Sequence, residues 1–67
     1  MASKEIDLRM NELAKREMSK NGWNQREFGD EMGLQESEVS LLFHGKRHWT
    51  LPLIEKLSSI TREKIEI

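Results

Sequence analysis

The sequence predicts a compact all-α domain of four to five helices. Apolar residues recur at helical spacing along most of the chain, glycines stand where three of these segments end, and only one proline is present. A chain of 67 residues is long enough for one domain, which would span residues 1–67. Such a short chain needs efficient packing, and helices with local contacts provide it most easily.

The first helix is expected over residues 4–20. On a helical wheel, three apolar residues fall within about 80° of Ile6, which makes four on one face. They are Ile6, Met10, Leu13 and Ala14. Leu8 falls on the far side, and the face opposite the apolar residues is charged. Gly22 follows as a left-handed residue that ends the helix.

The three later helices are predicted from the residues at their starts. Each start has a polar N-cap residue flanked by two apolar residues that can pack on each other. The N-caps are Asn24, Gln35 and Thr50, and the apolar pairs are Trp23 with Phe28, Leu34 with Val39, and Trp49 with Ile54. Glu27 and Glu38 stand where a capping box needs a carboxylate, and Pro52 lies in the first turn of the last helix.

These signals place two short helices on either side of a three-residue turn that begins at Gly33, and a further helix follows Gly45. The expected ranges are 25–32, 36–43 and 51–60. Two short helices joined by a turn containing glycine have the proportions of a helix-turn-helix over residues 24–44. Residues 61–67 alternate Ile65 and Ile67 across Glu66, which fits either a short strand or a frayed helical turn.

Composition excludes several classes of protein. The chain has no cysteine, so it forms neither disulfides nor thiolate metal sites, and no apolar run is long enough for a membrane span or a signal peptide. We therefore expect a cytoplasmic protein without membrane contact. Eleven Lys and Arg against twelve Asp and Glu give a net charge of −1, which by itself argues mildly against nucleic-acid binding.

The predicted helix over residues 36–43 has one face free. Leu42 and Phe43 lie within about 60° of Val39 on a helical wheel, so this side faces the core. The opposite side carries Ser37, Ser40, Leu41 and His44. Short hydroxyl side chains and a leucine can lie in a DNA major groove, although an ordinary solvent-exposed surface would look the same.

A basic segment follows this face. No acid occurs over residues 40–48, and Lys46 and Arg47 are candidate phosphate contacts. The same loop would otherwise be a solvated cationic surface. His44 and His48 have no nearby third ligand, so no metal site is expected.

From Gly22 to Ile60 the chain resembles the Xre-type helix-turn-helix family, which has the lambda repressor-like fold. The resemblance lies in Gly22-Trp23-Asn24-Gln25, Phe28-Gly29, Met32-Gly33, Ser37-Glu38-Val39-Ser40, Gly45 and Trp49-Thr50-Leu51. The segment from Gly22 to Ile60 that holds these short motifs is more than half of the chain, and their order and spacing need no gaps.

The resemblance implies a set of DNA contacts. Gln25 matches a glutamine that contacts phosphate and supports the recognition helix, and the neighbouring Arg26 is included as a contact. The base-facing positions of the family correspond to Glu36, Ser37, Ser40 and Leu41, and a phosphate contact beyond the helix corresponds to His44. Arg47 lies in the loop from which the family often adds further base or phosphate contacts. Glu36 departs from the usual glutamine and could accept from cytosine N4, while Gly29 replaces a common alanine and permits close helix approach.

The resemblance also implies a function. The expectation is sequence-specific binding of double-stranded DNA by a small bacterial or phage transcription regulator, a repressor that acts as a homodimer on a palindromic site. Its dimer surface would include residues 51–60, Ile65, Ile67 and Trp49. A narrower version is the antitoxin of a toxin–antitoxin pair, with a toxin protein as partner. The alternative is a protein-interaction adaptor, and neither enzymatic activity nor a cofactor is expected.

Overall fold

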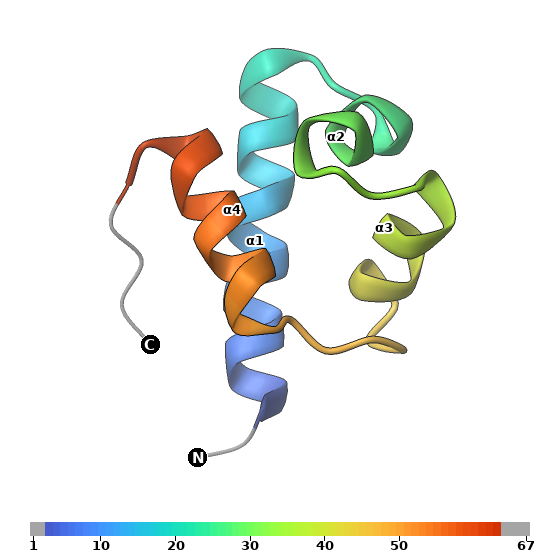
Figure 1. Ribbon diagram of the computed structural model, residues 1–67, viewed down its shortest axis with the longest axis vertical. Coiled ribbons are helices and arrows are strands. Elements are labelled where there is room, and N and C mark those ends of the chain that lie inside the picture. The colour runs from blue at the N-terminus through green and yellow to red at the C-terminus, as the bar shows by residue number, and fades with distance from the viewer. Residues whose placement is uncertain (1–2, 64–67) are drawn as a thin grey trace.

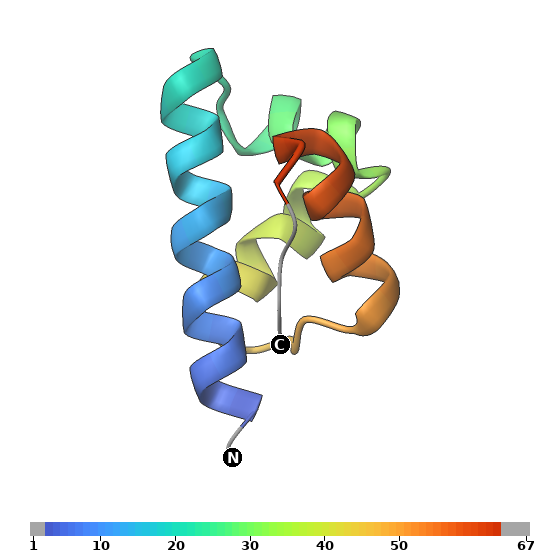
Figure 2. The same cartoon turned by 90° about the vertical axis from the view of Figure 1, so that its left-hand side faces the viewer.

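The computed structural model describes residues 3–63, which form four α-helices and no strand. The helices are α1 (Ser3–Asn21), α2 (Gln25–Met32), α3 (Glu36–Phe43) and α4 (Leu51–Thr61). The long helix α1 runs along one side of the molecule, and the three shorter helices pack together beside it (Figures 1 and 2). The predicted all-α class and the order of the four helices are thus confirmed.

Helix boundaries differ from the predicted ones by at most one residue. Helix α1 is one residue longer at each end, and α4 continues to Thr61. Arg62 then ends α4 in a left-handed conformation, with φ 60°, and its backbone N–H donates to the Ser58 carbonyl at 2.8 Å. The tail therefore begins as a helical turn, whereas Ile65 and Ile67 lie outside the described residues.

The predicted capping box forms at the start of α2. The backbone N–H of Glu27 donates to Asn24 Oδ1 at 2.8 Å, and the N–H of Asn24 donates to Glu27 Oε1 at 2.9 Å. The rings of Trp23 and Phe28 lie 6.4 Å apart between centroids, as expected for the apolar pair around this cap. These local contacts fix where α2 begins and how the chain enters it.

The start of α4 differs from the prediction in one respect. Thr50 occupies the N-cap position, but its side chain makes no capping hydrogen bond. Pro52 stands at the second helical position, so one of the two backbone N–H groups from which an N-cap hydroxyl can accept, those of the second and third positions, is missing. The expectation that Thr50 caps α4 is therefore right for the position and wrong for the hydrogen bond.

The core gathers the apolar faces of all four helices. Its buried members are Met10, Ala14, Phe28, Met32, Val39, Leu42, Trp49, Leu53, Ile54 and Leu57. Phe43 is half-buried and stacks on Phe28 with 6.0 Å between ring centroids. The predicted inner faces of α1 and α3 are the buried ones, and Leu8 is 55% exposed on the far side of α1, as predicted.

Helices α2 and α3 approach each other closely at Gly29. An added Cβ at this position would lie 2.7 Å from the Leu34 carbonyl oxygen, which is closer than real Cβ contacts come. The Leu34 N–H donates to the Gly29 carbonyl at 2.7 Å, and Gly33 takes φ 74° in the turn between the helices. Two glycines thus let a three-residue turn connect α2 to α3.

Candidate nucleic-acid interface

The outer face of α3 is free, as the helical wheel predicts. Val39 and Leu42 are fully buried, whereas Ser37 is exposed and Leu41 is 41% exposed. Ser40 is half-buried on the same side. The helix therefore presents small hydroxyl groups and one leucine to solvent. The long exposed side chain of α3 is that of Glu36, in its first turn.

None of the nine predicted contact residues is buried. Arg26, Glu36, Ser37, Leu41, His44 and Lys46 are exposed, and Gln25, Ser40 and Arg47 are half-buried. The first turns of α2 and α3 lie at the same right-hand edge of the molecule in Figure 1. The fold thus brings the start of α2, which holds Gln25 and Arg26, to the edge where α3 begins.

His44 is oriented by the last turn of α3. Its Nδ1 lies 2.8 Å from the Ser40 carbonyl oxygen and 3.2 Å from Ser40 Oγ. A carbonyl only accepts, so Nδ1 carries the hydrogen in this contact. In the part of the chain that the structure describes, Nε2 makes no hydrogen bond, and it is the ring atom that an external group can reach.

Arg47 is bound within the protein. Its Nη1 lies 2.6 Å from Glu38 Oε2 in an ion pair, and the other carboxylate oxygen of Glu38 accepts from the Gln35 N–H at 3.0 Å. The hydrogen bond from Gln35 and then the Arg47 guanidinium hold the pKa of Glu38 below its usual value of 4.5. The carboxylate is charged at neutral pH, and the pair is lost only as the pH falls through this lowered pKa.

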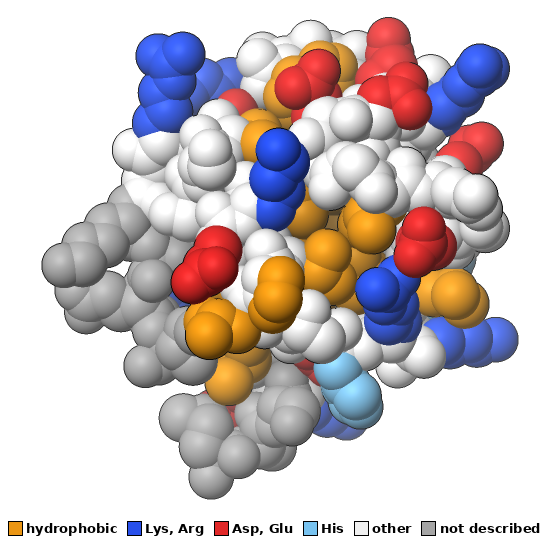
Figure 3. Space-filling model, viewed as in Figure 1, with side chains coloured by type: hydrophobic (Ala, Val, Ile, Leu, Met, Phe, Trp, Pro, Cys, Tyr) orange, Lys and Arg blue, Asp and Glu red, His pale blue; other side chains and the backbone are white. Residues whose placement is uncertain are grey.

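The ion pair changes the expected balance of charges around α3. Arg47 was predicted as a phosphate contact, but its charge is already matched by Glu38. Lys46 is exposed and makes no ion pair within residues 3–63. Figure 3 shows one face of the molecule, where cations and acids alternate around a central group of hydrophobic side chains rather than forming a basic patch. On this face, attraction to phosphate would depend on single cations and not on a basic patch.

Two polar residues of α1 fix the loop between α3 and α4. Both oxygens of Asp7 are used: Oδ1 accepts from the Trp49 N–H at 2.9 Å, and Oδ2 lies 2.7 Å from His48 Nδ1. Asn11 donates to the Leu42 carbonyl at 3.1 Å and accepts from the indole N–H of Trp49 at 2.8 Å. This network ties the end of α3 and the loop that holds Lys46 to α1.

Sequence reasoning missed this network and misplaced Trp49. Asp7 and Asn11 are only 7% exposed, and Trp49 is 6% exposed. The indole is buried in the monomer, so Trp49 does not contribute to a dimer surface as expected. The available signal was two polar residues, one helical turn apart, at the border of the apolar stripe of α1. Their partners lie 31–42 residues away along the chain, so local patterns did not indicate them.

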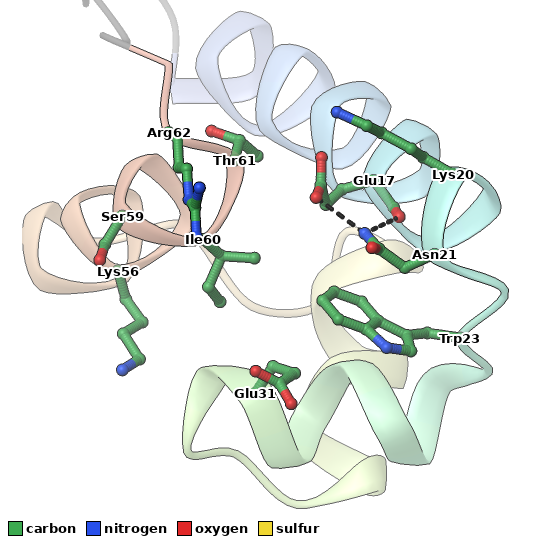
Figure 4. Close-up of a pocket in the computed structure, with 10 residues that line it drawn as sticks. All are labelled: Glu17, Lys20, Asn21, Trp23, Glu31, Lys56, Ser59, Ile60, Thr61 and Arg62. Carbon is green, nitrogen blue, oxygen red and sulfur yellow. Dashed lines mark hydrogen bonds between the residues drawn. The ribbon is translucent and has the colours of Figure 1, made fainter.

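A polar cleft lies between the C-terminal parts of α1, α2 and α4 (Figure 4). Its lining includes Glu17 and Asn21, whose side chains are hydrogen-bonded at 2.8 Å, together with three cations and a second acid. These are Lys20, Lys56, Arg62 and Glu31. The cleft shares no residue with the outer face of α3, and sequence reasoning did not indicate it.

Comparisons with protein-family models, with curated proteins and with solved structures found no match. Among residues 3–63, no group of three or more histidine, aspartate and glutamate side chains is placed to hold a metal ion. None of the four helices combines the length and the apolar character that a bilayer span requires.

Proposed function

We propose that this protein binds double-stranded DNA sequence-specifically, as a small transcription regulator that inserts α3 into the major groove. In this proposal, α2, the turn at Gly33 and α3 form a helix-turn-helix of the lambda repressor-like type. The main support is the division of α3 into two faces. Val39 and Leu42 are buried, while Ser37 and Leu41 are exposed on the other side.

The exposed residues of α3 have the chemistry for reading base edges. The hydroxyl of Ser37 can donate or accept at any base, and Leu41 can pack against a thymine methyl group. The carboxylate of Glu36 can accept from the amino group of cytosine. A carboxylate near phosphate lowers the affinity for DNA by charge repulsion. Glu36 therefore favours a site with a cytosine whose amino group it can bind.

Contacts to the sugar-phosphate backbone would orient the helix in the groove. Gln25 and Arg26 at the start of α2 and Lys46 beyond α3 flank the proposed reading surface. His44 adds the Nε2 atom that its contact with Ser40 leaves available. These groups supply position rather than sequence information.

The regulatory output follows from the size of the module. An eight-residue recognition helix reads only a few base pairs, so specificity requires two copies on a palindromic site. A homodimer on such a site would repress transcription by blocking the promoter. Leu51, at the start of α4, is 58% exposed and is a candidate for the contact between copies. An antitoxin that represses its own operon is the narrower form of the same proposal.

A protein-interaction adaptor is the second candidate. Three leucines are well exposed, at 55% for Leu8, 41% for Leu41 and 58% for Leu51. A net charge of −1 does not favour DNA in particular. An adaptor would bind a protein through such leucines and show no salt-sensitive affinity for duplex DNA.

The experiment that separates these candidates measures binding to a labelled duplex by fluorescence anisotropy at several salt concentrations. We expect the parent chain to bind, with an affinity that falls as salt rises, and Lys46→Ala to reduce the slope of log K against log salt by about 0.9. Lys20→Ala is the matched control, because it removes the same charge from an exposed residue of the cleft at the end of α1. Equal slopes for the two variants would remove Lys46 from the interface, and an absence of binding even in dilute buffer would favour the adaptor.

A further inference from the structure

The carboxylate of Glu38 is held on both of its oxygens. Oε1 accepts from the Gln35 N–H at the start of α3, and Oε2 accepts from Arg47 Nη1 at 2.6 Å. The first contact fixes the carboxylate relative to the helix, so the second fixes Arg47 beside it. The predicted role of Glu38, a capping residue, accounts for the contact to Gln35 but does not require the contact to Arg47.

Arg47 would otherwise be a good ligand for phosphate. Its guanidinium has five N–H donors in a planar fork that fits carboxylate and phosphate equally well. Within the described part of the chain, its only side-chain hydrogen bond is the one to Glu38. The carboxylate of Glu38 thus occupies a position on Arg47 that an oxygen of DNA phosphate could take.

We propose that Glu38 substitutes for DNA phosphate on Arg47 and thereby limits the sequence-independent affinity of the chain for duplex DNA. The inference rests on the proposed function and identifies a residue that tunes it. Both side chains are 36% exposed, so solvent screens the pair and a phosphate can reach it. If Arg47 left Glu38 for a DNA phosphate, the carboxylate of Glu38 would remain unpaired beside the DNA. The repulsion between this carboxylate and the phosphates would cancel most of the affinity gained from the new contact.

Salt dependence measures this effect directly. Each cation that contacts phosphate releases a counterion and contributes about 0.9 to the slope of log K against log salt. An Arg47 that stays paired with Glu38 adds almost nothing to this slope, whereas an Arg47 freed from Glu38 adds the full value of one phosphate contact. The substitution Glu38→Gln removes the charge but keeps an amide oxygen that can accept from the Gln35 N–H, so the cap of α3 is retained.

The test compares the parent with Glu38→Gln, Arg47→Ala, the double variant and the control Glu63→Gln on a random-sequence duplex. Glu63 is matched because it also pairs with an arginine, Arg16, at 3.5 Å, and its removal changes the net charge by the same amount. We expect Glu38→Gln to bind about eightfold more tightly than the parent at about 0.1 M salt, with a slope steeper by about 0.9. Glu63→Gln and Arg47→Ala should keep the slope of the parent, and the double variant should lose the gain. Circular dichroism melting of each variant checks that the fold is retained.

Two results would overturn the inference while leaving DNA binding in place. In the first, Glu38→Gln and Glu63→Gln behave alike, so only net charge matters. In the second, the double variant keeps the gain, so the effect comes from repulsion by Glu38 and not from Arg47. If neither the parent nor Glu38→Gln binds duplex DNA in dilute buffer, both the inference and the proposed function are wrong.

Discussion

Asn11 links three parts of the fold through one side chain. Its amide donates to the carbonyl of Leu42 in α3 and accepts from the buried indole of Trp49 in the following loop. Each of these backbone or ring groups is shielded from water, so none can be left unpaired without a cost in free energy. Asn11 therefore keeps the loop beyond α3 in one position relative to α1.

We expect Asn11→Ala to lower the free energy of unfolding by about 2 kcal/mol, because it leaves a buried indole N–H and a buried carbonyl without partners. The measurement is urea unfolding followed by tryptophan fluorescence. Asn21→Ala is the control, since the side chain of the exposed Asn21 bonds, among residues 3–63, only to Glu17 within the last turn of α1. Its effect should stay within about 0.5 kcal/mol. Equal losses for the two variants would show that the network around Trp49 contributes no particular stability.

At this scale, the sequence predicted local contacts and missed distant ones. The capping box of Asn24 and Glu27 could be predicted because its two residues lie three positions apart. The ion pair between Glu38 and Arg47 and the contacts of Asp7 could not, because they depend on how a loop folds back on a helix. Candidate contact residues on α3 were found because a helical wheel separates its buried and exposed sides.

At the scale of the elements, the close packing at the junction of α2 and α3 requires a glycine at position 29. At Gly29 the two segments are too close for a side chain, since a Cβ would lie 2.7 Å from a backbone oxygen of Leu34. A backbone atom cannot move aside as the end of a flexible side chain can. Any larger residue therefore has to push the turn at Leu34 away from α2.

The substitution Gly29→Ala should destabilise the fold by about 1–3 kcal/mol through overpacking, although alanine is about 1 kcal/mol better than glycine in an isolated helix. Thermal unfolding measured by circular dichroism tests this. Asp30→Ala is the control, because Asp30 is the next residue of α2 and is exposed. We expect it to be neutral or slightly stabilising. A Gly29→Ala variant that melts above the parent would mean that the junction can open without cost.

Helix positions were predictable because the residues at each start and end signal them independently of the rest of the fold. Gly33 has the positive φ expected of a residue that ends a helix. Thr50 is different, since it stands at the N-cap position but its side chain makes no capping hydrogen bond, and Pro52 removes one of the two N–H groups it could use. Patterns place an element more reliably than they identify the hydrogen bonds that stabilise it.

At the scale of the whole molecule, charge and shape point in different directions. The net charge of −1 gives no general attraction to nucleic acid, and one of the predicted cations is paired within the protein. The shape instead offers a short helix with a buried side and a free side of serines and leucine. The composition of the chain could not predict these two sides of α3, whereas the helical periodicity of its apolar residues could.

The most direct test of the central claim, that the outer face of α3 enters DNA, is a titration of the ¹⁵N-labelled protein with duplex DNA followed by NMR. We expect the largest shift changes at Ser37, Leu41 and Lys46, and none at Lys56 and Ser59, which line the polar cleft on α4. Changes confined to that cleft, or spectra that do not respond to DNA in dilute buffer, would contradict the account.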